Sequence, residues 1–554
     1  MLFWLCGVSG ILYFGFTHIR LSHSVPAVGW SIHDDQEYEM VGEETLPDFP
    51  TPVVVSDKRG RAKWTVSIPP SYEFPLEPEI YKEICLQSME ASNHVMDLHK
   101  YKHVTHQAHY DYYHVDPYFM DVAEAEKHGM LPSPGSMVSS SSWDLVRNEK
   151  DGSIIGENKD ELVDKDICEK SMTFIMESSD AGLGQTMLLL WMAYGLAQKE
   201  ERAFFVDDSR WYVGYFAACG ILLTFIRAYG KYTNFFKPPP APNCRPPPRH
   251  EMLPCPHHAR HLVVSASTRR WSFGGAFNEH FEDPRKMEVY RQKPIFELAR
   301  AGYEALFQLA ESDSSYVQNR IMELVAKTVH VPPETQDGII IGIHVRHGDC
   351  HPMEFQYSDS YIPLDRYTEK ARVLLHTSFN SSAPNGDENL MAEMRSIMVL
   401  ASDDPDVYDS EEFSHASRAQ QLIHLASRSI IATPVLEPTG NSLFKRFVEE
   451  SVGWEGGFFA GMFWSLGRSD VTPTSEPLDP KVQPTAEATR LRELVGRAYL
   501  MDLAVLGGVS DAIVCTVSSM GCKLLAVMMG WEKSIENKGW INIDGEFEWR
   551  AVSW

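Results

Sequence analysis

Basic residues are scarce in this sequence. Among 554 residues, 50 are Lys or Arg and 76 are Asp or Glu, so the formal net charge is −26. A nucleic-acid-binding protein needs a basic surface to displace the counterions of the phosphate backbone. The charge balance therefore excludes nucleic acid as an expected partner. It is still compatible with a local basic pocket for a phosphorylated ligand.

Internal repeats, heptads and long apolar runs are also missing beyond the first residues. A solenoid or a coiled coil is therefore not expected. Hydrophobic residues make up 44% of the chain and charged residues 23%, which is typical of globular proteins. The length leaves room for two to four ordinary domains.

The one long apolar run lies at the beginning of the sequence. Its first sixteen residues, MLFWLCGVSGILYFGF, contain no charge. Extended to residue 19, the run is long enough to cross a bilayer, which takes about 17–25 residues. It predicts a transmembrane signal anchor over residues 1–19, and a cleaved signal peptide is the alternative. The anchor predicts a single-pass type II protein of the Golgi or ER membrane, with the rest of the chain in the lumen.

The cysteines agree with an oxidising compartment. The sequence has nine, and one of them, Cys6, lies inside the predicted anchor. The other eight form an even set that can pair into disulfides in the lumen. Their spacing does not determine which cysteine pairs with which.

Changes in sequence texture divide the rest of the chain. Residues 20–75 are acidic and contain proline, and we interpret them as a stem. Residues 76–170 are a helical segment rich in His and Tyr. Its histidines do not repeat a metal-ligand spacing, so an aromatic and histidine-rich surface is favoured over a metal site.

Two α/β regions follow the helical segment. Strand, turn and helix alternate from residue 171, with a proline-rich surface insertion near residues 237–248. We predict an N-terminal Rossmann-like lobe over residues 171–335 and a second, C-terminal α/β lobe over residues 336–554. The fold class is α/β, with two lobes that face a cleft.

Polar side chains gather where predicted strands end. In a parallel sheet the carboxyl ends of the strands form a ligand crevice, and helix N-termini there present free N–H groups to anions. The strongest such element is IGIHVRHGDC, in which a buried run delivers His344 and Arg346 to a strand end. An arginine can hold a diphosphate through two hydrogen bonds.

Three further turns have the same position in the pattern. The first is a glycine turn with Gly182, Gly184 and Gln185, where the backbone can approach a ligand closely. Ser518 and Ser519 precede a helix, where they suit a phosphate or serve as a plain N-cap. Asp403 and Asp404 follow another strand. They can bind a divalent metal, a base or a ribose, or can cap a helix that begins at Pro405.

These motifs occur in the order found in GDP-fucose fucosyltransferases. The chain most resembles the α1,6-fucosyltransferase family that modifies the N-glycan core or rhizobial chitin oligosaccharides. Protein O-fucosyltransferases are more distant relatives. The resemblance covers roughly residues 171–535. It implies a GT-B fold and an inverting transfer of fucose from GDP-fucose to a glycan without a metal or other cofactor.

The resemblance also implies roles for single residues. Arg346 would hold the β-phosphate, and His344 would line the nucleotide site. Asp403 would contact guanine, Asp404 would lie in the same site, and Ser518 with Ser519 would contact the phosphates. An inverting transfer needs a general base, for which Asp349 and Glu354 are the candidates.

The sequence departs from the family pattern in three places. His347 stands where many members have a second arginine, Cys350 stands where they have a lysine, and the glycine turn is one residue shorter. Three alternatives therefore stay open: a protein O-fucosyltransferase, a non-catalytic protein that binds a GDP-sugar or glycan, and a metal-dependent transferase that uses the aspartates after Ser402.

Overall fold

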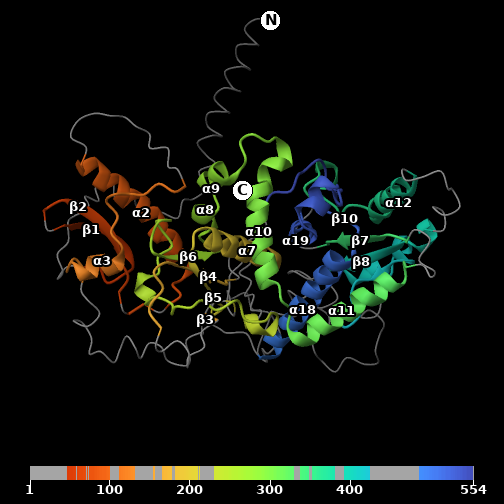
Figure 1. Ribbon diagram of the computed structural model, residues 1–554, viewed down its shortest axis with the longest axis horizontal. Coiled ribbons are helices and arrows are strands. Elements are labelled where there is room, and N and C mark those ends of the chain that lie inside the picture. Colours follow the sequence, from red (N-terminus) through yellow and green to blue (C-terminus); the bar gives the residue numbers. More distant parts are fainter. Residues whose placement is uncertain are drawn as a thin grey trace, which may run out of the picture. The chain divides into compact units, whose positions relative to one another are not determined.

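The structure is a computed structural model. It describes residues 46–57, 59–69, 71–72, 74–99, 112–131, 154–155, 165–177, 181–209, 211, 230–329, 337–347, 352–380, 392–423 and 486–552. The elements below belong to one unit that begins at Val41 (Figure 1). None of the helices in these ranges is both long and apolar enough to cross a membrane. The predicted anchor over residues 1–19 lies outside the described residues.

The first described region is a small α/β layer. Strands β1 (Thr51–Ser56) and β2 (Ala62–Ser67) form an antiparallel hairpin. Helices α2 (Pro78–His99) and α3 (Val122–Lys127) pack against it. The structure thus differs from the predicted stem, because Thr51–Ser56 and Ala62–Ser67 are strands, the first with a buried run over residues 53–55.

The second region carries a sheet with strand order β3-β5-β4-β6. Its strands are β3 (Ile154–Ile155), β4 (Ser171–Ile175), β5 (Ala203–Asp207) and β6 (His261–Ser265). β4 pairs in parallel with β5 and β6, and only β3 is antiparallel. The predicted proline-rich insertion forms no helix, and its only strand-like contact is an isolated bridge at Arg245.

The third region carries a parallel sheet with strand order β11-β10-β7-β8-β9. Its strands are β7 (Ile340–Val345), β8 (Ile397–Ser402), β9 (Ser417–Arg418), β10 (Ala512–Cys515) and β11 (Trp540–Asn542). Every residue of β7 is buried. A continuous apolar run of this kind is typical of a parallel strand covered on both faces.

Helices surround and connect the two parallel sheets (Figure 1). The α-helices are α7 (Leu183–Lys199), α8 (Arg269–Ser272), α9 (Gly275–Phe281), α10 (Lys293–Leu306), α11 (Glu311–Ala326), α12 (Leu364–Asn380), α14 (Pro405–Tyr408), α18 (Ala486–Val509) and α19 (Met520–Met529). Short 3-10 helices are η2 (Tyr232–Asn234), η3 (Arg249–Glu251), η4 (Glu288–Gln292), η5 (Phe355–Tyr357) and η6 (Glu411–Phe413), and η8 (Glu532–Glu536) is a π-helix.

Helices α7 and α10 pack unusually closely because each supplies a glycine. A Cβ atom on Gly195 would lie 2.1 Å from the Leu298 carbonyl oxygen, and one on Gly302 would lie 2.1 Å from that of Trp191. α10 and α7 both contact α19. The Arg300 guanidinium also donates to the carbonyl oxygens of Val527 and Met528. The core of the second region therefore continues into the third.

Two of the three disulfides among the described residues join segments that lie far apart in the sequence. The disulfides are Cys85–Cys255, Cys168–Cys244 and Cys515–Cys522. They confirm the expected pairing for six of the eight cysteines beyond Cys6. Cys219 and Cys350 lie outside the described residues.

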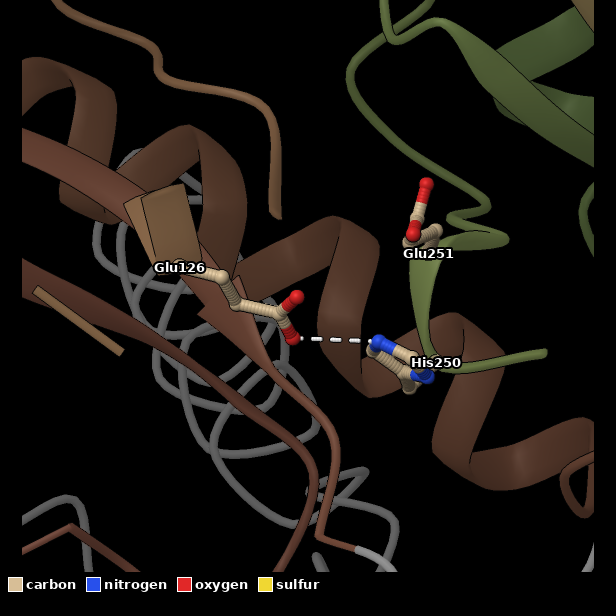
Figure 2. A group of neighbouring side chains, drawn as sticks. All are labelled: Glu126, His250 and Glu251. Atoms are coloured by element: carbon tan, nitrogen blue, oxygen red, sulfur yellow. Dashed lines mark ion pairs between the residues drawn. The ribbon is translucent and has the colours of Figure 1, made fainter. Parts of the chain in front are cut away.

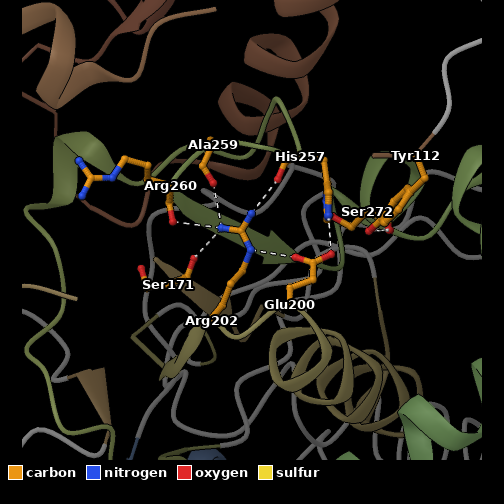
Figure 3. A network of polar contacts seen from close by, with 8 residues as sticks. All are labelled: Tyr112, Ser171, Glu200, Arg202, His257, Ala259, Arg260 and Ser272. Atoms are coloured by element: carbon orange, nitrogen blue, oxygen red, sulfur yellow. Dashed lines mark hydrogen bonds and ion pairs between the residues drawn. The ribbon is translucent and has the colours of Figure 1, made fainter. Parts of the chain in front are cut away.

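Arg202 organises the amino edge of the β3–β6 sheet (Figure 3). Its Nε donates to Glu200 at 2.8 Å, and Glu200 pairs with His257 at 2.7 Å. Burial opposes ionisation of Glu200, but His257 and Arg202 together hold its pKa below the usual value. The other guanidinium nitrogens of Arg202 donate to the carbonyl oxygens of Ser171, His257, Ala259 and Arg260.

Candidate functional site

Three neighbouring parallel strands end at one edge of the C-terminal sheet. The register pairs Val345 with Ser402 across β7 and β8, and Ile343 with Val514 across β7 and β10. The segments that follow these strands therefore start side by side. They carry the residues selected from the sequence, namely Arg346, Asp403, Asp404, Ser518 and Ser519. The structure thus brings together the polar elements that follow β7, β8 and β10.

Arg346 and Asp403 form an ion pair at the centre of this edge. The Arg346 Nη1 donates to Asp403 Oδ2, and the side chains are 15% and 3% exposed. The other carboxylate oxygen of Asp403 accepts the backbone N–H of His347 at 2.6 Å. Asp403 therefore holds Arg346, and the contact with guanine that the family resemblance implies stays a prediction.

His347 is held on several sides. Its Nδ1 lies 2.9 Å from Asp404 Oδ2, and its ring stacks on Tyr361 with centroids 4.1 Å apart. Asp404 also caps α14, because its Oδ1 accepts the backbone N–H of Asp406 at 2.9 Å and Pro405 occupies the first turn. The capping alternative for this segment is confirmed. The two aspartates that the sequence suggested as metal ligands contact side chains instead: Asp403 pairs with Arg346, and Asp404 with His347.

His344 and the start of α19 are in contact beneath this edge. His344 is 5% exposed, and a Cβ atom on Gly521 would lie 2.7 Å from its ring. Only glycine fits at this position without a shift of the imidazole. His344 therefore supports the turn between β10 and α19, which the disulfide between Cys515 and Cys522 spans.

The N-terminus of α19 is suited to an anion. Ser519 is the N-cap residue, yet its side chain makes no capping hydrogen bond. The buried Ser519 Oγ has no hydrogen-bond partner within the described part of the chain. Ser518 is exposed. The first N–H groups of a helix have no partners inside the helix, and the helix dipole adds positive potential. This turn can receive a phosphate.

Residues after β11 complete the edge and were not identified from the sequence. Asp544 is fully buried, and its carboxylate accepts the backbone N–H groups of Met353 and Glu354 at 3.0 and 2.7 Å. Asn542 accepts the N–H of Val517 at 2.8 Å and so orders the turn before α19. Asn542 ends the three-residue strand WIN and Asp544 lies two residues beyond it, and so short a strand gives no pattern that could have found them.

Glu354 belongs to the same loop network. Its Oε2 accepts the Gly545 N–H at 3.0 Å, and its Oε1 accepts the Gln356 side-chain amide at 2.8 Å. Both carboxylate oxygens therefore hold the loop in place. The other candidate base, Asp349, lies outside the described residues.

The glycine turn belongs to the carboxyl edge of the other parallel sheet. Gly182 is the N-cap residue of α7, and Gly184 and Gln185 lie in its first turn. Two buried carboxylates share this edge and were not selected from the sequence. Glu177 Oε1 accepts the Ser267 N–H at 2.6 Å, and burial raises the pKa of Asp207.

Comparisons with known proteins give a likeness to solved structures but to no family model. No family model matches the chain, and no curated protein matches it. Among solved structures it is similar to the crystal structure of NodZ alpha-1,6-fucosyltransferase co-crystallized with GDP. That likeness has a TM-score of 0.26 and 13% sequence identity, and it covers 64% of this chain and 90% of the other.

Proposed function

We propose that this chain is a glycosyltransferase that transfers fucose from GDP-fucose to a glycan. The observation that carries the proposal is the carboxyl edge of the C-terminal sheet. An arginine held by a buried aspartate lies there, next to a helix start whose serine hydroxyl is unused among the described residues. Such an edge suits the diphosphate of a nucleotide sugar.

The chemistry needs a positive group where charge develops. When the bond between the sugar and the diphosphate breaks, negative charge collects on the leaving phosphate. Arg346, oriented by Asp403, would stabilise that charge without a metal ion. Its orientation is fixed before a ligand binds, so little reorganisation is needed during the reaction. The sequence motifs shared with GDP-fucose fucosyltransferases support fucose as the sugar.

The acceptor would be bound from the opposite lobe. Carboxylates accept hydrogen bonds from sugar hydroxyl groups, and Glu177 and Asp207 lie buried at the carboxyl edge of the β3–β6 sheet. Asp349 is the proposed general base, because Glu354 already uses both oxygens within its loop. The three disulfides are consistent with the proposed location in the lumen of the Golgi or ER.

A direct transfer assay tests the proposal. The full chain is incubated at 25 °C with GDP-fucose and a panel of N-glycans, chitin oligomers and folded protein acceptors. GDP release, product mass and the anomeric form of the product are then measured. We expect an inverted product, formed equally with EDTA or added Mn²⁺. We expect Arg346→Ala to abolish it and the exposed control Arg372→Ala to retain it. No product with any acceptor would refute the enzyme proposal.

One observation favours a second candidate, a non-catalytic GDP-sugar-binding protein. Glu354, a carboxylate proposed as base, is committed to its loop. This candidate predicts GDP binding that depends on Arg346, with no turnover. Replacing Asp349 by Asn separates the two: in an enzyme it slows transfer by a factor of about 10² to 10⁴ while GDP still binds.

A further inference from the structure

A cluster of metal-ligating side chains lies far along the chain from the motifs above. Glu126 comes from α3, and His250 and Glu251 come from η3. One donor atom from each residue can be chosen so that all three lie within 4.8 Å of one another. Figure 2 shows Glu126 extending from its helix toward His250, with their ion pair of 3.0 Å drawn between Oε1 and Nε2.

The cluster is buried, which makes its charge costly. The side chains of Glu126, His250 and Glu251 are 16%, 8% and 14% exposed. Two shielded carboxylates at this spacing are a place where a divalent cation gains binding energy.

A second histidine, His261, lies beside Glu251. His261 Nε2 lies 3.7 Å from Glu251 Oε2, and His261 Nδ1 lies 3.0 Å from Ser171 Oγ. Partners of this kind behind the ligands are typical of metal sites.

We propose that Glu126, His250 and Glu251 bind one Zn²⁺ ion, with His261 as the outer partner of Glu251. Ligand atoms around tetrahedral zinc lie about 2.0–2.1 Å from the metal, and hence about 3.3 Å from one another. The 3.0 Å between Glu126 Oε1 and His250 Nε2 is close to that spacing. The imidazole favours zinc over Mg²⁺ and Ca²⁺, which prefer oxygen ligands.

The position assigns the ion a structural role. His261 and Ser171 are the first residues of β6 and β4, so the cluster lies at the amino edge of that sheet. Ligands that react in open α/β sheets bind at the opposite, carboxyl edge. The ion would join α3 to η3, near the disulfide between Cys85 and Cys255. The inference does not depend on the proposed transferase activity.

Metal content tests this site directly. The full chain is expressed with zinc, dialysed, and analysed for metal by mass spectrometry. Zinc is then titrated into chelator-treated protein. We expect about one bound Zn²⁺ per chain and a lower thermal midpoint after chelation. Glu126→Gln and Glu251→Gln should each weaken zinc binding at least about tenfold. The matched control is Glu124→Gln in the same helix, whose exposed carboxylate is 3.8 Å from His128 and should leave binding unchanged.

Two outcomes would overturn the proposal. The first is a wild-type chain that contains no zinc and whose thermal midpoint does not change when chelator is added. Glu126 and His250 would then form a plain ion pair. Equal loss of zinc in the Glu124→Gln control would place the ion elsewhere. If Glu126→Gln does not fold, Co²⁺ bound to the wild-type chain provides the second measurement. The intense visible bands of a low-coordinate site are expected, and their absence would also reject it.

Discussion

The ion pair between Arg346 and Asp403 allows a quantitative prediction. Their side chains are 15% and 3% exposed, so both charges are largely removed from water. Removing one partner of a buried pair costs about 3–5 kcal/mol, because the other charge stays buried without its counter-charge. Asp403→Asn should lower the free energy of unfolding by about 3 kcal/mol. This is the lower end of that range, because part of Arg346 still reaches solvent.

A double-mutant cycle isolates this coupling. Arg346→Ala, Asp403→Asn and the double variant are compared by urea unfolding at pH 7. Removing both charges leaves neither one stranded, so the double variant should be more stable than the sum of the single losses by about 2 kcal/mol. GDP stabilisation should vanish in both variants that lack Arg346. If the stability losses of the two single variants add up to the loss of the double variant to within about 0.5 kcal/mol, the reasoning is refuted.

Two further predictions concern the fold. Gly302→Ala should lower the free energy of unfolding by about 3 kcal/mol, because its Cβ would lie 2.1 Å from the Trp191 carbonyl oxygen. Gly275→Ala is the control and should be tolerated, because no atom lies within 4 Å of its Cβ. Equal urea midpoints for the two variants would contradict this prediction. His261 has a pKa of about 4 against 6.5 unfolded, so the unfolded chain binds the extra proton. The neutral His261 therefore contributes about 3 kcal/mol to the free energy of unfolding above pH 6.5, and this contribution is lost as the pH falls to 4. The stability difference between wild type and His261→Gln, followed by urea unfolding, should shrink over that range, and a constant difference would contradict it.

The C-terminal edge was predictable because its strands are continuous apolar runs with abrupt polar ends. Residues 340–343 form one such run, and His344 and Arg346 follow it within three residues. The turn before α19 was predictable for the same reason. The partner of Arg346 was not, because it depends on the register that aligns Val345 with Ser402.

Other features depend on contacts between distant parts of the chain. Asp544 follows the three-residue strand β11, which is too short to stand out as a pattern. The strands β1 and β2 were hidden in a segment interpreted from its acidic and proline-containing composition. Glu126 and His250 meet only because α3 and η3 pack together. Neither local propensity nor motif spacing contains that information.

The central claim is that the C-terminal edge binds a guanine nucleoside diphosphate through Arg346. The most direct measurement is the thermal midpoint of the full chain with GDP, UDP or no nucleotide. A ligand that binds only the folded state stabilises it by RT ln(1 + [L]/Kd), so the shift measures affinity. We predict stabilisation by GDP, little by UDP, and none in Arg346→Ala. Equal shifts with GDP and UDP, or a GDP shift that survives Arg346→Ala, would contradict the account.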